Sequence, residues 1–300
     1  MKRLSTVCLV FLSCMAALPA QPAPTVENLD AAKVSRRHPA ESAIYENLDA
    51  YIRKVKSDWN IRGLVVQIGD GKGVLFSRGY GYRDDEAAEK IPMDSHTLFQ
   101  IASVSKSFTT ALLAILVDEG KLSWDDRVVD ILPEFRMYDD WVTENMLVKD
   151  LSCHRTGLKG SAGASLARLG YSKEDMMRFM RFFKPVYPFR GGYQYNNHTF
   201  CVCALIVEKI TGRSWEQNVV ERLYKPLGMT ESTFRGPVYE AAFALHSASQ
   251  PYGWRGEGGR MVTTRLTPED VCPGVWASSE AAGGIICTPA DMFRWAQFHL

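Results

Sequence analysis

The sequence predicts an α+β protein in which a strand hairpin precedes a long helical region. Two short runs rich in β-branched and apolar residues, 64–68 and 74–77, flank a glycine-rich turn at 69–73, which is the pattern of a β-hairpin. Further along the chain, the runs 109–117 and 200–210 are apolar on nearly every side, which is typical of buried helices. Because the hairpin is followed by a long helical region and strands do not alternate with helices, this order favours an α+β fold.

Length and composition narrow the class of protein. The chain has 300 residues, 46% of them hydrophobic and 23% charged, which is ordinary for a globular protein with a sizeable core. Its 35 Lys and Arg residues nearly balance its 34 Asp and Glu residues, for a net charge of +1. We therefore expect no nucleic-acid partner, since such binding requires an excess of basic residues.

Residues 1–20 have the pattern of a secretory signal peptide. A basic start precedes the apolar segment 4–18, and Leu18-Pro19-Ala20 offers a small-residue cleavage site. The apolar segment is short for a membrane span, and no later run is long enough to cross a bilayer. We expect a secreted or periplasmic protein without an integral span after cleavage. Two alternatives remain open: a lipoprotein anchored through Cys14, or an uncleaved anchor.

The mature chain is expected to begin with a flexible leader, residues 21–40, rich in proline, alanine and charged residues. Residues 41–300 are expected to form the folded domain, whose first helix the apolar spacing places at 42–59. The hairpin then needs partner strands, because two antiparallel strands are not a stable sheet by themselves. No run between 81 and 300 supplies such strands convincingly.

Capping signals mark several later helices. Ser172 and Ser214 each open a capping pattern, and Thr288 begins a last helix with proline at its first position. The segment 231–284 is rich in glycine, serine and proline and has few periodic runs. It is predicted to consist of loops.

Cysteine and histidine spacing indicates neither a disulfide framework nor a metal site. Five cysteines remain after signal cleavage, and we expect most of them to be small buried apolar residues: Cys153, Cys201, Cys203, Cys272 and Cys287. The six histidines are scattered, and His154 and His246 are expected to have no chemical role. No metal and no other cofactor is therefore expected.

Ser103 and Lys106 form a Ser-x-x-Lys pair at the start of the buried helix predicted over 104–119. Three residues are most of one helical turn, so the two side chains would share one face. A serine hydroxyl is a poor nucleophile until a base takes its proton, and a buried lysine amine can be that base. Taken alone, the same residues also fit a helix cap followed by a solvated lysine.

A second polar group stands at Tyr195-Asn196-Asn197, between a glycine-containing turn and the second buried helix. A tyrosine phenol beside a lysine can relay a proton, and the Asn197 amide can bind a substrate carbonyl and the lysine together. Taken alone, Tyr195 also fits an aromatic residue packed at a helix entry.

Together the two groups resemble the first two motifs of the serine β-lactamase and penicillin-binding-protein superfamily, Ser-x-x-Lys and Tyr-x-Asn. The similarity is greatest to its class C-like branch of serine hydrolases, which includes esterases and D-amino-acid peptidases. Five further segments resemble that branch in the same order: Phe99-Gln100-Ile101-Ala102, the turn 118–126, Ser152-Cys153-His154-Arg155-Thr156-Gly157-Leu158, Lys225-Pro226-Leu227-Gly228-Met229 and Ala282-Gly283-Gly284-Ile285.

The resemblance implies a β-lactamase/transpeptidase-like fold, with an antiparallel sheet flanked by helices and an all-helical lobe. It implies that Ser103 is the acylated nucleophile, Lys106 its base or proton partner, Tyr195 a base or proton relay, and Asn197 a substrate-binding group. The substrate would be a small molecule or peptide with an ester, amide or peptide carbonyl, a β-lactam included. The backbone N–H of Ser103 would form half of an oxyanion hole.

The sequence departs from the family pattern at the third motif. Neither Lys-Thr-Gly nor His-x-Gly follows the Ala282-Gly283-Gly284 segment. In the family this motif lies on a strand that pairs with the N-terminal hairpin and supplies the second oxyanion donor. We therefore expect a C-terminally truncated piece of such a hydrolase. The alternative is a catalytically inactive binding protein on the same scaffold.

Overall fold

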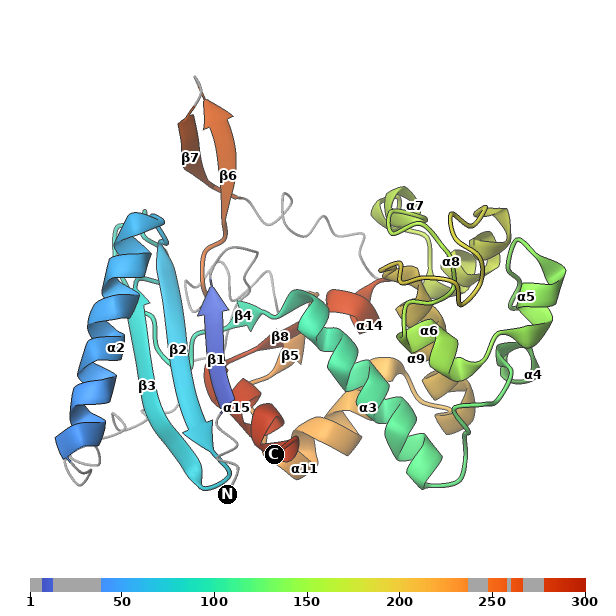
Figure 1. Cartoon of the computed structure of the whole chain (residues 1–300), viewed down its shortest axis with the longest axis horizontal. Helices are drawn as coiled ribbons and strands as arrows, with labels where there is room; N and C mark the ends of the chain where they lie inside the picture. The colour runs from blue at the N-terminus through green and yellow to red at the C-terminus, as the bar shows by residue number, and fades with distance from the viewer. Residues whose placement is uncertain (1–6, 13–38, 237–247, 258–259, 267–277) are drawn as a thin grey trace. The chain divides into compact units, whose positions relative to one another are not determined.

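The computed structural model describes residues 7–12, 39–236, 248–257, 260–266 and 278–300 (Figure 1). The chain divides into two compact units. Unit 1 comprises residues 1–100, 236–271 and 286–300, and unit 2 comprises residues 101–235 and 272–285. Unit 1 carries most of the strands and unit 2 most of the helices, so the predicted α+β content is confirmed.

The main sheet of unit 1 is antiparallel, in the order β1-β2-β3. The predicted hairpin is confirmed as β2 (Gly63–Asp70) and β3 (Gly73–Gly81), both longer than the β-rich runs indicated. The Asp70 side chain closes the turn by accepting hydrogen bonds from the backbone N–H groups of Lys72 and Gly73. The pairing of β2 with β3 continues up to the turn, where Asp70 lies opposite Gly73.

The partner strand that the hairpin needs is β1 (Val7–Leu12), which pairs with β2. This strand lies inside the predicted signal peptide. In the structure β1 pairs with the edge of β2 that β3 leaves open. The signal peptide stays a prediction.

Helices cover unit 1's sheet on the faces that alternation predicts. Helix α2 (Pro39–Asp58) lies along β2 and β3 in Figure 1, and its Ile52 packs with Leu64 and Val66. Val65 points to the opposite face and joins another apolar cluster. Helix α15 (Pro289–Phe298) begins at the Thr288 cap, whose side chain accepts a hydrogen bond from the Asp291 N–H as the sequence predicted.

The prediction of loops across 231–284 was wrong for several segments. The structure has strands β5 (Thr233–Phe234), β6 (Tyr252–Glu257) and β7 (Arg260–Arg265), and the short helix α14 (Glu280–Gly283). The β6–β7 hairpin contains glycine and arginine and lacks clear alternation, so its local pattern was weak. A tertiary contact supports it instead: the buried Asp84 carboxylate accepts a hydrogen bond from the Tyr252 hydroxyl and forms an ion pair with Arg265.

Strands β4 (Phe99–Gln100) and β8 (Ile285–Cys287) are very short. Strand β4 pairs with β8 through Phe99 opposite Cys287 and Gln100 opposite Ile286. Strands this short have no sequence periodicity, so only the folded chain reveals them.

Unit 2 is built around two apolar helices, α3 and α9. Its helical segments, in order, are η1 (Ala102–Val104), α3 (Ser105–Asp118), α4 (Val128–Ile131), α5 (Asp140–Asn145), α6 (Val148–Ser152), α7 (Ala164–Arg168), α8 (Lys173–Phe179), η2 (Met180–Phe182), α9 (His198–Thr211), α10 (Trp215–Val219), η3 (Val220–Tyr224), α11 (Lys225–Leu227) and α14. The predicted caps are confirmed, since Ser172 and Ser214 each accept a hydrogen bond from the N–H three residues on.

Burial explains why α3 and α9 are apolar nearly all round. Phe108, Leu112 and Leu113 of α3 are fully buried, and α9 packs against α3, α8 and α14. Cys201 and Cys203 are buried on α9, which agrees with their predicted role as small apolar residues. Cys287 is also buried, Cys153 is exposed, and Cys272 lies outside the described residues.

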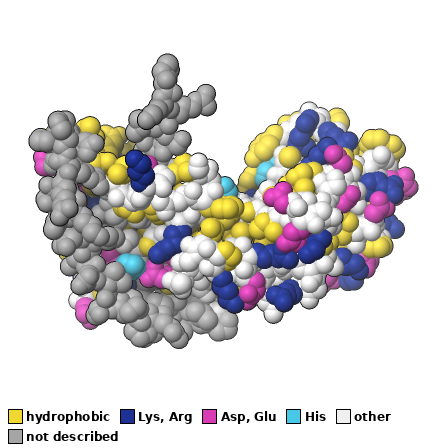
Figure 2. All heavy atoms as spheres, turned by 90° about the horizontal axis from the view of Figure 1, so that it is seen from below, with side chains coloured by type: hydrophobic (Ala, Val, Ile, Leu, Met, Phe, Trp, Pro, Cys, Tyr) yellow, Lys and Arg dark blue, Asp and Glu magenta, His cyan; other side chains and the backbone are white. Residues whose placement is uncertain are grey.

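The described surface has mixed charge. On the face drawn in Figure 2, Lys and Arg side chains lie interspersed with Asp and Glu side chains, as the near-zero net charge would suggest. In the part of the chain that the structure describes, none of the helices combines the length and apolar character that a bilayer crossing requires.

Candidate active site

Ser103 lies in unit 2 on the one-turn helix η1, directly before α3. The residue before it, Ala102, has a φ of 45°, in the left-handed region that non-glycine residues seldom adopt. Such backbone strain is held in place by surrounding contacts and is common at functional sites. Here the neighbouring Ile101 N–H is tied to the Ile285 backbone oxygen, and the Ser103 side chain is left exposed.

Lys106 stands one turn beyond Ser103, as the Ser-x-x-Lys spacing predicted. Its Nζ atom donates to three oxygens: Oγ of Ser103 at 3.0 Å, Oδ1 of Asn197 at 2.7 Å and the backbone oxygen of Ala282 at 2.7 Å. These three acceptors match the three N–H donors of an ammonium group. The Tyr195 ring lies 4.7 Å from Nζ and adds a cation–π contact.

Burial changes the acidity of Lys106. The side chain is 7% exposed, and removal from water lowers its pKa from 10.5 to about 8. A buried thiolate at Cys201 would oppose this shift, but burial raises the pKa of Cys201 to about 12, so the thiol is neutral at pH 7. A measurable fraction of Lys106 is therefore a neutral amine near neutral pH, with a lone pair able to accept a proton.

Tyr195, Asn196 and Asn197 divide three tasks between them. The Tyr195 hydroxyl donates a hydrogen bond to Oγ of Ser103 at 2.6 Å. Oδ1 of Asn197 accepts a hydrogen bond from Nζ of Lys106. The intervening Asn196 is fully buried, and its Oδ1 accepts the N–H groups of His198 and Thr199 at the start of α9. Because Asn196 caps the helix, the Asn197 amide remains available to the lysine.

The structure thus brings together all four side chains that the sequence proposed, Ser103, Lys106, Tyr195 and Asn197, within unit 2 alone. The Ser103 oxygen receives one hydrogen bond from a phenol and one from an amine. Loss of a proton from Lys106 would leave a lone pair directed at the Ser103 hydroxyl, which is the geometry of base-assisted nucleophilic attack.

The backbone of α14 completes the lysine site, and sequence reasoning missed this role. The Ala282 oxygen accepts from Lys106, and the Ala281 oxygen accepts from Oγ1 of Thr109 at 2.8 Å. Thr109 in turn accepts the indole N–H of Trp215 at 3.0 Å. The Ala282-Gly283-Gly284 segment resembles a family string, but a backbone carbonyl carries no side-chain signal that would reveal its partner.

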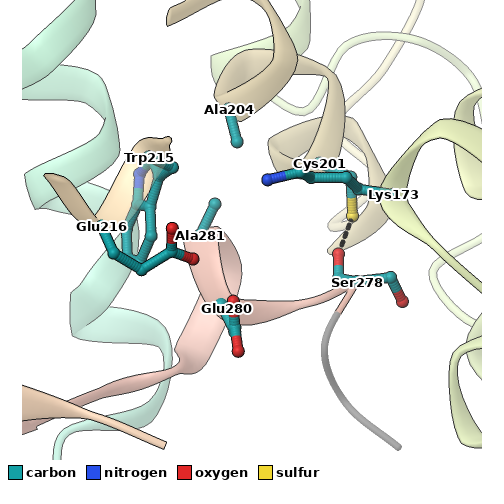
Figure 3. A pocket seen from close by; sticks show the side chains of 8 residues that line it. All are labelled: Lys173, Cys201, Ala204, Trp215, Glu216, Ser278, Glu280 and Ala281. Carbon is teal, nitrogen blue, oxygen red and sulfur yellow. Dashed lines mark hydrogen bonds between the residues drawn. The ribbon is translucent and has the colours of Figure 1, made fainter. Parts of the chain in front are cut away.

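Beside α14 lies a small pocket lined by an acidic pair, Glu216 and Glu280, together with Lys173 (Figure 3). The Glu280 and Glu216 carboxyl groups lie close enough to shift each other's pKa. Burial, hydrogen bonding with Glu216 and the negative charge of Glu216 raise the pKa of Glu280 to about 8. For Glu216 burial acts in the raising direction, but the hydrogen bond from Glu280 and the charge of Lys173 outweigh it and lower the pKa.

This acidic pair predicts a pH-dependent stability. The folded-state pKa of Glu280 is about 8, above its usual value of 4.5, so between these pH values the native state keeps a proton that the unfolded chain has released. Stability then falls as pH rises through this window, by up to about 1.4 kcal/mol per pH unit. Glu280→Gln keeps a neutral donor toward Glu216, so its urea unfolding midpoint is expected to fall less between pH 5 and pH 8 than that of the wild type.

Glu221→Gln is the matched control for this measurement. Glu221 is exposed and its pKa is lowered by its hydrogen bond to Lys225, so it stays ionised throughout the window. Equal pH dependence of wild type and Glu280→Gln would contradict the expectation.

Of the two histidines considered in the sequence, His154 lies beside Tyr195, with the ring centres 4.4 Å apart. His246 lies outside the described residues. Among the residues that the structure describes, no group of three or more His, Cys, Asp or Glu side chains is arranged to hold a metal ion.

Comparison with known proteins identifies relatives over most of the chain. A family model described as "Beta-lactamase" matches residues 48–300. The unguisins hydrolase ungD' of Aspergillus campestris is 29% identical over 274 residues, covering 88% of this chain and 48% of that protein. Penicillin-binding protein 4 of Amycolatopsis lactamdurans is 29% identical over 213 residues, covering 70% of this chain and 52% of that protein.

A solved class C β-lactamase has the same fold, with a TM-score of 0.65 at 22% identity over 85% of this chain and 65% of that one. The β-lactamase/transpeptidase-like fold expected from the sequence is therefore confirmed. The chain spans about half the length of the curated relatives described above.

Proposed function

The chain belongs to the β-lactamase family, and on that premise we propose that it is an exported serine acyl-hydrolase whose acyl-enzyme forms on Ser103. The observation that carries the proposal is the pair of hydrogen bonds at one oxygen: Oγ of Ser103 is 3.0 Å from Nζ of Lys106 and 2.6 Å from the Tyr195 hydroxyl. A serine held between an amine and a phenol has the base that its nucleophilicity requires.

The reaction proceeds in two steps. In acylation, neutral Lys106 takes the Ser103 proton while Oγ bonds to the substrate carbonyl carbon. The bond to the alcohol or amine leaving group then breaks, and that group takes up the proton, with Tyr195 as the relay. In deacylation a water molecule gives a proton to the same base pair and its oxygen attacks the ester carbonyl. Ser103 is released with its hydroxyl restored.

The chemistry of the site and the names of the relatives support the proposed substrate class. An uncharged serine nucleophile beside an amide group, Asn197, suits a carbonyl that accepts hydrogen bonds. The relatives are named as a hydrolase of unguisins and a penicillin-binding protein, which supports ester, amide or peptide carbonyls, β-lactams included, as the class. We also propose that residues 1–20 direct export, which the N-terminal sequence of the secreted protein would test.

Covalent labelling tests the proposal. The full-length protein is treated with a fluorophosphonate or with fluorescent penicillin, digested, and the labelled peptide is mapped. We expect the label on Ser103. Ser107→Ala, which removes a serine one turn further along α3, should still be labelled. No label on the wild type, or a label on another residue, would refute the acyl-enzyme and favour the alternative, an inactive binding protein on this scaffold.

A further inference from the structure

The segment that carries Tyr195 is held along a second segment, residues 154–159, by a series of hydrogen bonds within unit 2. These bonds run from Val186 N–H to the Gly157 oxygen, from Arg190 N–H to the Arg155 oxygen, from Gln194 N–H to the His154 oxygen, and from the Asn196 amide to the Lys159 oxygen, each at 2.9 Å. The series ends at the residues on either side of Tyr195.

His154 makes the contacts closest to Tyr195. Its backbone oxygen binds Gln194, the residue before Tyr195, and its Nδ1 accepts the N–H of Asn196, the residue after it, at 3.2 Å. Its imidazole ring lies 4.4 Å from the Tyr195 ring, centre to centre, with the planes tilted by 36°. One residue therefore holds the backbone on both sides of the tyrosine and also packs on its ring.

The position of His154 is itself constrained. The residue is buried and has a φ of 58°, in the left-handed region where His and Asn are among the more tolerated residues. The imidazole also lies 5.5 Å from the Phe200 ring of α9. Backbone strain and burial at a residue that contacts the proposed proton relay point to a role beyond filling space.

Tyr195 needs such support. Its side chain is 36% exposed, yet its hydroxyl lies 2.6 Å from Oγ of Ser103. An exposed tyrosine would otherwise sample other rotamers, and small errors of position at a reacting group reduce rates strongly.

We propose that His154, as a neutral imidazole whose Nδ1 accepts the Asn196 N–H, is a positioning residue that holds the Tyr195 hydroxyl on Ser103. The inference rests on the proposed function and adds to it a residue that touches no reacting atom. Because Nδ1 is the acceptor, the ring proton lies on Nε2.

The same geometry makes the role sensitive to protonation. An imidazolium would place an N–H at Nδ1 opposite the Asn196 N–H, and the hydrogen bond would be lost. Burial, with the positive charge of Lys106, lowers the pKa of His154 below its usual 6.5, which keeps the ring neutral at neutral pH. The titratable groups that face the ring are Tyr193 and Tyr195, through ring contacts, and Lys106 through its charge.

Two substitutions test the Nδ1 acceptor of His154 and its aromatic ring separately. In His154→Asn, Oδ1 takes the place of Nδ1 on the same Cγ and the residue tolerates a left-handed backbone, but the ring is lost. In His154→Phe the ring stays and the acceptor is lost. With p-nitrophenyl acetate as the probe, we expect kcat to fall about 10- to 100-fold in His154→Phe. We expect His154→Asn to retain most of the wild-type rate.

The same two substitutions in a Tyr195→Phe background show whether His154 acts on kcat through the Tyr195 hydroxyl. In a Tyr195→Phe background, His154→Phe and His154→Asn are expected to agree within about twofold, because no hydroxyl is left to position. A general loss of folding would instead separate the two variants equally in both backgrounds. Thermal unfolding of each variant supplies the check on folding.

A pH profile of the wild type keeps the inference testable even if His154→Phe does not fold. Below the pKa of His154, the slope of log kcat/KM against pH should steepen from about one to about two, as His154 protonates in addition to Lys106. His154→Asn should keep a slope of about one. Active wild type labelled on Ser103, with equal rates and equal slopes for all three forms, would overturn the role of His154 and leave the proposed function standing. Absence of labelling would refute the proposed function itself.

Discussion

Ser103→Ala is expected to abolish turnover of p-nitrophenyl acetate, with a fall in kcat of about 10⁶-fold, as for loss of the nucleophile in other serine hydrolases. The physical reason is that no other hydroxyl of the site combines exposure with a hydrogen bond from both Lys106 and Tyr195 in the described structure. Nearby Ser105 is buried, and its Oγ accepts the Ile285 N–H. The measurement is a steady-state rate on purified wild type and variant at equal concentration.

Ser107→Ala is the control for this substitution, because it removes a hydroxyl of α3 that donates a hydrogen bond to the Val104 oxygen of the preceding turn. Its rate should be close to that of the wild type. Full activity of Ser103→Ala would show that ester cleavage takes place elsewhere on the protein.

Lys106→Met is expected to lower kcat by about 10³- to 10⁴-fold, the upper range for loss of a general base. Methionine has a similar length and suits a buried position, so the variant should fold, although three acceptors around Nζ lose their donor. Wild-type kcat/KM should rise with pH through about 8, because only the neutral amine accepts the Ser103 proton. The variant should lack this rise.

Lys121→Met, on an exposed lysine paired with Glu119, is the matched control and should leave both the rate and the pH profile unchanged. Wild-type activity that decreases as pH rises through 8 would contradict the base role. So would a Lys106→Met variant with normal turnover and a normal pH profile.

Local features of the fold were predictable because they depend on neighbouring residues. The hairpin turn at Asp70, the caps at Ser172 and Ser214, and the start of α15 each rest on bonds across two or three positions of the chain. The prediction of loops between 231 and 284 failed where structure depends on distant partners. The β6–β7 hairpin is anchored to Asp84, which lies 168 positions before Tyr252.

The candidate site also combines features that depend on neighbouring residues with features that depend on distant ones. The pair Ser103 and Lys106 is predictable from the sequence, because the i, i+3 spacing on a helix places both residues on one face. The sequence also identifies Tyr195 and Asn197 as one polar group. That these groups meet depends on the folded chain, since Lys106 binds Asn197 across 91 positions and Ala282 across 176.

Packing also decided what each group can do chemically. The lowered pKa of Lys106 comes from burial, and the place of Tyr195 comes from its contacts with His154, two effects that no local spacing contains. Residue types and short spacings determine which chemistry the chain offers. Whether a lysine is a base or a solvated cation depends on how much water the folded chain excludes around it, and that is a property of the tertiary structure.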